Sequence, residues 1–142
     1  MKRTVIAVAA AIGSLLVPFG IMRAQTERAL YQVPFSFNAE GVELSSGKYI
    51  LSSRGPQTGM LRGENGKGIL FIISGTLSGK DPHSRLTFNK YVTPNGDRYF
   101  LRQVWDGKTG SPMPVSIEER EILRNQQEAQ TIPEKVTVAA KR

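Results

Sequence analysis

The one histidine of the chain, His83, lies beside two other side chains that could take part in chemistry, Asp81 and Ser84. An aspartate and a histidine together supply two metal ligands, whereas protein zinc sites use three or four. A Ser–His–Asp triad is brought together in space by the fold and is not a run of sequence neighbours. The segment is therefore predicted to be a solvated loop, with no catalytic and no metal-binding residues.

Glycine-rich and acidic segments suggest two further kinds of site, and neither fits. The segment Gly75–Lys80 has one residue too few between its glycines for a phosphate-binding loop. Asp97 and Asp106 lie at opposite ends of one predicted strand, which is too far apart for a pair of catalytic carboxylates. We therefore predict a protein that is not an enzyme and that binds no cofactor.

The first 24 residues have the pattern of a secretory signal peptide. A basic start, Met1–Arg3, precedes the apolar run 4–17, and Ala24 offers a small residue before a cleavage at Gln25. The alternative is an uncleaved anchor helix, but the apolar run is shorter than the ~20 residues that span a bilayer. We expect a secreted or periplasmic protein that has no stable membrane insertion after cleavage.

Cleavage would also change the charge of the protein. The chain of 142 residues has 19 basic and 12 acidic residues, and three of the basic ones precede Gln25, so the formal charge falls from +7 to +4. Much of the apparent basicity thus belongs to the leader, and a nucleic-acid partner is not expected. The chain has no cysteine and so no disulfide. A mature domain of this size can be held by its apolar core alone.

The strongest local signal is the stretch 84–105, which is centred on Asn95-Gly96. An Asn-Gly pair between apolar runs is typical of a two-residue hairpin loop, because both loop positions need positive φ. That loop would place Val92 opposite Tyr99. Side chains alternate along a strand, so one face of the hairpin is predicted to carry the core, with Leu86, Phe88, Tyr99, Leu101 and Trp105.

The opposite face of this hairpin carries Tyr91, Phe100 and Arg102. Aromatic rings interleaved with basic groups are typical of sheets that bind single-stranded nucleic acid, but the export signal argues against that partner. These three residues are our prediction for a contact surface toward a protein or an envelope component. The alternative is that the C-terminal helix covers part of this face.

A second Asn-Gly pair, Asn65-Gly66, predicts another hairpin between the segments 58–64 and 67–74. The run Ile69–Ile73 is apolar on both faces, so we predict that it is a central strand. Two further strands are predicted upstream, at Val33–Phe37 and Lys48–Ser53.

Beyond residue 115 the composition becomes that of a helix. Ser116 and Glu119 have the spacing of a capping box, in which the two side chains cap the first turn reciprocally. Residues 117–130 contain no glycine or proline, and their apolar stripe is narrow, so the helix should lie on the rim of the sheet or project into solvent. Weak strand character follows at 135–139.

Together these segments predict a mainly β protein, an antiparallel β sandwich or a partly open barrel of six to eight strands with one C-terminal helix. The predicted divisions are a signal peptide (1–24), a frayed N-terminus (25–30), the antiparallel β domain (31–114), the C-terminal helix (115–130) and a flexible basic tail (131–142).

The chain resembles a group of small secreted bacterial β-proteins with no known activity. The matching residues are Val33–Phe37, Gly41, Leu44, Gly47, Tyr49, Asn95–Leu101, Val104-Trp105 and the helix 116–129. The turn Thr93–Asp97 is longer than the Tyr-Gly-Asp tip associated with the group. The resemblance implies a fold and an exported location, and it implies no mechanism.

We therefore expect a non-enzymatic exported module that binds a protein or an envelope component, through a sheet edge or through the Tyr91, Phe100 and Arg102 face. The alternative is a barrel that binds a small apolar ligand. What separates the two is whether the large aromatic side chains fill the interior or line a hollow. These side chains are Phe35, Phe37, Phe71, Phe88 and Trp105.

Overall fold

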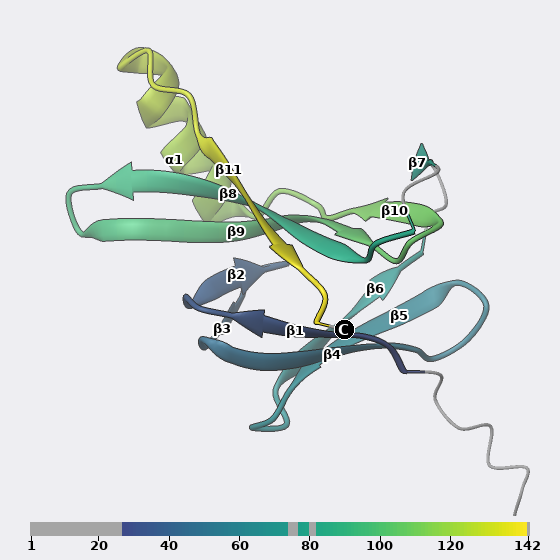
Figure 1. Ribbon diagram of the computed structural model, residues 1–142. Coiled ribbons are helices and arrows are strands. Elements are labelled where there is room, and N and C mark those ends of the chain that lie inside the picture. The colour runs from purple at the N-terminus through teal and green to yellow at the C-terminus, as the bar shows by residue number, and fades with distance from the viewer. Residues whose placement is uncertain (1–26, 74–76, 80–81, 142) are drawn as a thin grey trace, which may run out of the picture.

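The computed structural model describes residues 27–73, 77–79 and 82–141 (Figure 1). The predicted cleavage between Ala24 and Gln25 lies outside these residues, and so does Asp81. In chain order the elements are β1 (Glu27–Val33), β2 (Phe37–Ala39), β3 (Val42–Leu44), β4 (Gly47–Ser53), β5 (Thr58–Gly63), β6 (Gly68–Ile72), β7 (Leu77–Ser78), β8 (Arg85–Thr93), β9 (Gly96–Trp105), β10 (Thr109–Pro112), α1 (Ile117–Glu128) and β11 (Glu134–Ala139).

Two sheets face each other, as Figure 1 shows. One is a 4-stranded sheet in the order β1-β4-β5-β6, and the other is a 7-stranded sheet in the order β11-β8-β9-β10-β7, in which β2 pairs with β9 and β3 pairs with β2. All strand pairs are antiparallel except β2 with β9, where Asn38 lies opposite Phe100. The prediction of a mainly β, antiparallel fold with one helix near the C-terminus is confirmed. The predicted number of strands is six to eight. Eight of the described strands have four or more residues, and β2, β3 and β7 are short strands of two or three residues.

The sheets do not close into a barrel. Along one side they meet where the Lys141 N–H donates to the Leu30 carbonyl at 2.8 Å. Along the other side β6 pairs only with β5 among the described strands.

The core lies between the two sheets, and aromatic rings fill much of it. Phe37 is central, with its ring centroid 5.1 Å from that of Phe88 and 5.2 Å from that of Tyr49. At the margin Phe35 stacks on Tyr99 with 3.8 Å between centroids. Aliphatic side chains complete the core from both sheets, at Val33, Leu44, Leu51, Leu61, Ile69, Leu86, Leu101 and Val104.

The β8–β9 hairpin forms as predicted, but with another loop. Thr93 pairs with Gly96, so the two loop residues are Pro94 and Asn95. Proline has the fixed φ that suits the first central position of a type I turn. Gly96 then supplies the positive φ, at 111°, of a glycine that follows such a turn. The register predicted from an Asn95-Gly96 loop is therefore wrong: Val92 faces Asp97, not Tyr99.

A β-bulge changes the faces further along this hairpin. Phe88 pairs with Leu101 and Thr87 with Gln103, which leaves Arg102 as the extra residue. After the bulge Val104 points into the core, and Trp105 lies on the opposite face, where Arg85 sits 5.2 Å above its ring. Leu86, Phe88 and Leu101 are core residues as predicted, and Tyr99 packs at the margin. Trp105 is buried, but it is not part of the core between the sheets.

The second hairpin joins β5 to β6 as predicted, but not through a two-residue Asn65-Gly66 loop. The Gly63 N–H donates to the Lys67 carbonyl, so Glu64, Asn65 and Gly66 form a three-residue loop, in which Gly66 has the positive φ, at 84°. The prediction of a central strand at Ile69–Ile73 is wrong, because β6 is the last strand of its sheet. Ile69 and Phe71 are buried, whereas Leu70 and Ile72 point outward and are 58% and 74% exposed.

Both ends of the described chain are more regular than predicted. Residues 27–30, expected to be frayed, belong to β1, which pairs with β4. Residues 134–139, assigned to a flexible tail with weak strand character, form β11 and pair along β8 from Lys90 to Arg85. The half-buried Val136 and Val138 pack against the core, which explains why this segment is ordered.

Candidate functional site

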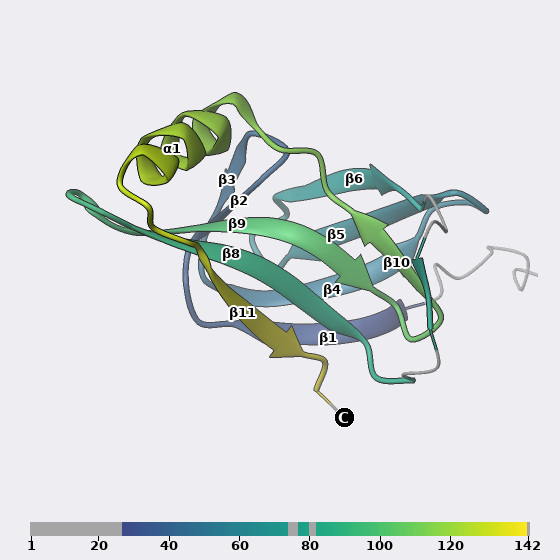
Figure 2. The same cartoon turned by 90° about the horizontal axis from the view of Figure 1, so that it is seen from above.

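The predicted contact surface lies beneath the helix. Tyr91 and Phe100 share one face of β8–β9, with their rings edge to face at 5.6 Å. Helix α1 lies against this side of the hairpin, which faces away from the four-stranded sheet (Figure 1 and Figure 2). Both side chains are fully buried, at 0% and 1% exposure. The prediction that they form an open contact surface is therefore wrong, and the alternative of a helix-covered face holds.

A buried carboxylate fixes the helix to this face. The Glu119 side chain is only 2% exposed, and its Oε1 accepts a hydrogen bond from the Tyr91 hydroxyl at 2.9 Å. Its Oε2 lies 3.5 Å from Nη1 of Arg102, which also donates to the Met113 carbonyl at 3.0 Å. We call Tyr91, Arg102 and Glu119 the Glu119 clamp. A buried carboxylate is tolerated here because it is both hydrogen-bonded and paired with a cation.

Two other contacts hold α1 in place. Two turns after Glu119, the Gln126 Nε2 donates to the Val92 carbonyl at 3.1 Å. At the start of the helix Glu118 pairs with Arg98 at 2.5 Å. Polar side chains thus perform much of the docking that a wide apolar stripe performs in most surface helices. These residues anchor the helix on the sheet, while most of its other side chains are exposed, in line with its narrow apolar stripe.

The capping box is only half formed. The Ser116 hydroxyl accepts from the Glu119 N–H at 3.2 Å, as predicted. The Glu119 carboxylate, which was expected to reach back to the start of the helix, turns instead toward Tyr91 and Arg102. The carboxylate gains two partners there, the Tyr91 hydroxyl and the Arg102 guanidinium, and such charge-assisted contacts are strong in a buried site.

The clamp has the geometry of a structural contact. Its carboxylate and its phenol are buried and occupied by each other, which leaves no open position for a substrate. His83 is exposed and Ser84 is half-buried on the segment before β8. Among the described residues there is no group of three or more side chains placed to hold a metal ion.

A different surface is exposed on the four-stranded sheet. Its outward side carries five apolar side chains from all four strands, which we call the outer aliphatic face: Leu30, Ile50, Met60, Leu70 and Ile72. Leu30 lies opposite Ile50 on the neighbouring strand, and Met60 lies opposite Leu70. The outward side of an antiparallel sheet is usually polar when water covers it, so this aliphatic surface is unusual.

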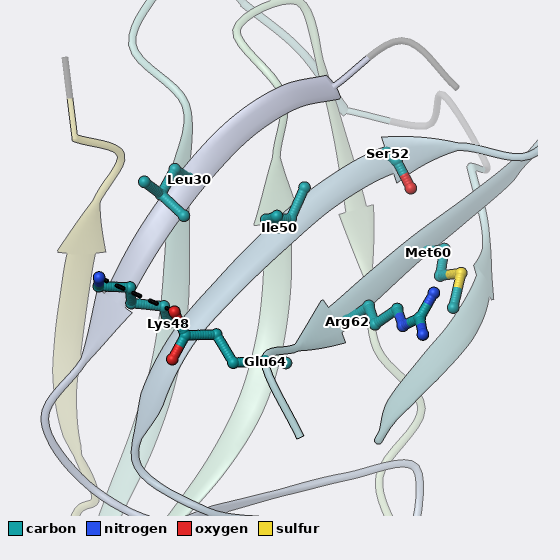
Figure 3. A pocket seen from close by; sticks show the side chains of 8 residues that line it. Leu30, Lys48, Ile50, Ser52, Met60, Arg62 and Glu64 are labelled. Atoms are coloured by element: carbon teal, nitrogen blue, oxygen red, sulfur yellow. Dashed lines mark ion pairs between the residues drawn. The ribbon is translucent and has the colours of Figure 1, made fainter. Parts of the chain in front are cut away.

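Charged groups border the outer aliphatic face (Figure 3). Lys48 and Glu64 form an exposed ion pair at 3.8 Å. Arg62 is exposed on β5, and the Arg54 Nε donates to the Met60 sulfur at 3.2 Å. An open hollow of about 320 Å³ lies here. It is lined by Lys48, Arg62 and Glu64 together with Leu30, Ile50, Ser52, Met60 and Gly63.

The sequence pattern missed this surface for an identifiable reason. Ile69–Ile73 is apolar at every position, which is typical of a strand with both faces covered. The order of strands along the chain offered a different signal. β6 is the second strand of the β5–β6 hairpin, and such a strand can be the last one of its sheet. Leu70 and Ile72 are exposed because they point to the outward side of the four-stranded sheet, which no described helix covers.

Comparison with protein-family models, with curated protein sequences and with solved structures gives no match. The resemblance to small secreted bacterial β-proteins thus remains a prediction from the residue pattern. Within residues 27–73, 77–79 and 82–141, no helix has the length and apolar content to cross a membrane.

We expect folding stability to fall in alkaline solution through the buried tyrosines. Burial, together with the hydrogen bond to Glu119, raises the pKa of Tyr91 to about 12, and burial raises the pKa of Tyr31 to about 12. Unfolded tyrosines ionise near pH 10, so the stabilising contribution is complete below pH 10 and is lost as pH rises toward 12. Urea unfolding at pH 8 and pH 11 measures this loss.

The matched variant Tyr91→Phe removes one of these phenols. Its own loss of stability between pH 8 and pH 11 should be smaller than that of the unchanged protein. An equal loss in both proteins would show that Tyr91 is not protected from ionisation.

Proposed function

We propose that the protein is an exported, non-enzymatic module that binds another protein of the envelope or cell exterior through its outer aliphatic face. The observation that carries the proposal is the exposure of Leu70 and Ile72, at 58% and 74%, beside Met60 on the adjacent strand β5, with Ile50 one strand further away on β4. Contiguous apolar surface on a small domain is typical of interaction sites. The charged groups around it give the polar rim that such sites carry.

The interior packing supports this function over the small-ligand alternative. Phe37, Tyr49 and Phe88 contact one another between the sheets, and Phe35 stacks on Tyr99. The aromatic side chains thus fill the interior where a barrel would keep a cavity. The hollow near Ile50 and Met60 opens on the outside of the sheet, where it suits a side chain of a protein partner.

The exported location rests on the N-terminal pattern of Met1–Arg3 and the apolar run 4–17. Production of the full chain in a bacterium, followed by intact-mass measurement of the extracytoplasmic protein, tests it. The expected mass is that of a chain that begins at Gln25. Full-length protein retained with the cytoplasmic or membrane fraction would contradict export.

The proposed binding face is tested by site-specific photo-cross-linking in the native cells. A photoreactive amino acid at position 50 should give a discrete adduct, because Ile50 lies within the outer aliphatic face. The same amino acid at position 92 is the control, since Val92 is more accessible than Ile50, at 68% against 36%, but belongs to the other sheet.

The adduct at position 50 should disappear when Leu70→Lys is added, because a charged group then interrupts the apolar surface. If position 50 gives no adduct, or if position 92 gives the same one, the outer aliphatic face is not the binding site.

A further inference from the structure

The backbone of β6 has one side without a partner strand. The Gly63 N–H donates to the Lys67 carbonyl, and the Ile73 N–H donates to the Gln57 carbonyl, both at 2.8 Å. Hydrogen-bonded and non-bonded pairs alternate along an antiparallel ladder. With the continuous register of β5 and β6, Ile69 and Phe71 must therefore direct their backbone groups toward β5.

The residues between them direct their N–H and C=O groups away from the sheet. These residues are Gly68, Leu70 and Ile72, and no described strand pairs with them on that side. The same Leu70 and Ile72 have exposed side chains. One short segment thus offers both unpaired ladder groups and apolar side chains.

The devices that usually protect an edge strand are missing from β6. Natural edges carry a lysine, a proline or a bulge, or they are covered by another segment. The segment Gly68–Ile72 has no charged residue and no proline, and its pairing with β5 has no bulge. The opposite edge of this sheet differs, since β1 receives the hydrogen bond from Lys141. β6 is therefore available for an added strand.

The charges around this edge indicate what the added strand carries. Among the described residues near the outer aliphatic face, the exposed cations are Lys48, Arg54, Arg62 and Lys67, and Glu64 is already paired with Lys48. Arg62 lies directly opposite Gly68, at the start of the edge. A second copy of β6 would bring no carboxylate to these cations, whereas an acidic segment would complement them.

We propose that β6 is a docking edge, at which an extended, apolar segment of a partner protein with acidic residues at its ends adds to the sheet as a fifth strand. The proposal rests on the proposed function and specifies its partner. Main-chain hydrogen bonds to Gly68, Leu70 and Ile72 would supply affinity. Leu70 and Arg62 would supply selectivity. Leu70 would favour a segment with apolar residues at alternate positions, and Arg62 would favour negative charge.

The test uses a labelled synthetic peptide of alternating threonine and valine with an aspartate at each end, and fluorescence anisotropy with the purified protein. We expect saturable binding that Leu70→Lys weakens by about tenfold or more, corresponding to about 1.4 kcal/mol. Val92→Lys is the matched control, exposed on the other sheet, and should leave the affinity unchanged. Circular dichroism confirms that both variants are folded.

A charge exchange tests the acidic preference independently. Arg62→Glu should weaken binding of the aspartate-ended peptide and should strengthen binding of the same peptide with lysine at each end. Failure of the peptide to bind, equal binding to Leu70→Lys, or no change of preference with Arg62→Glu would each overturn the proposal. Self-association that Leu70→Lys abolishes, without peptide binding, would identify a second copy as the occupant and would also overturn it.

These outcomes are separable from the proposed function. Cross-linking at position 50 without peptide binding would leave the outer aliphatic face as an interaction site and remove β6 as a strand-docking edge. Peptide binding without cross-linking at position 50 would support β6 as a docking edge. It would contradict the outer aliphatic face as the site that binds the partner.

Discussion

The buried carboxylate of Glu119 decides which of the two outward sheet faces is covered. Each sheet buries one side in the common core, and α1 is the one helix of the described chain. Glu119 accepts a hydrogen bond from the Tyr91 hydroxyl and forms an ion pair with Arg102. Both of these residues belong to the seven-stranded sheet. Once the helix is fixed there, the outward side of the four-stranded sheet has no such cover.

The bulge at Arg102 prepares the surface that receives the helix. It moves Val104 into the core and Trp105 to the other side of the sheet. Bulges redirect side chains and increase the local twist of a strand. Arg102 is the extra residue, and its guanidinium reaches both Glu119 and the Met113 carbonyl just before the helix. One irregularity in β9 thus connects the sheet, the approach to the helix and the helix itself.

Local chemistry in the sequence identified much of this fold. The β5–β6 hairpin, the burial of Phe88 and Leu101 and the Ser116 cap all follow from neighbouring residues. What the sequence missed depends on residues far apart in the chain. Glu119 has the spacing of a capping box, but its carboxylate contacts Tyr91 on β8 and Arg102 on β9 instead of the start of the helix. The edge position of β6 depends on which strands pair, and the exposure of Leu70 depends on which sheet face the helix covers.

Amide hydrogen exchange of the free protein, residue by residue, tests most directly the claim that the β6 edge is open. In this account the N–H groups of Leu70 and Ile72 exchange rapidly, because they point away from β5, while those of Ile69 and Phe71 are bonded to β5 and exchange slowly. That alternation is the predicted result. Equal, strong protection at all four positions would contradict it, since it would mean that the edge is already covered in the free protein.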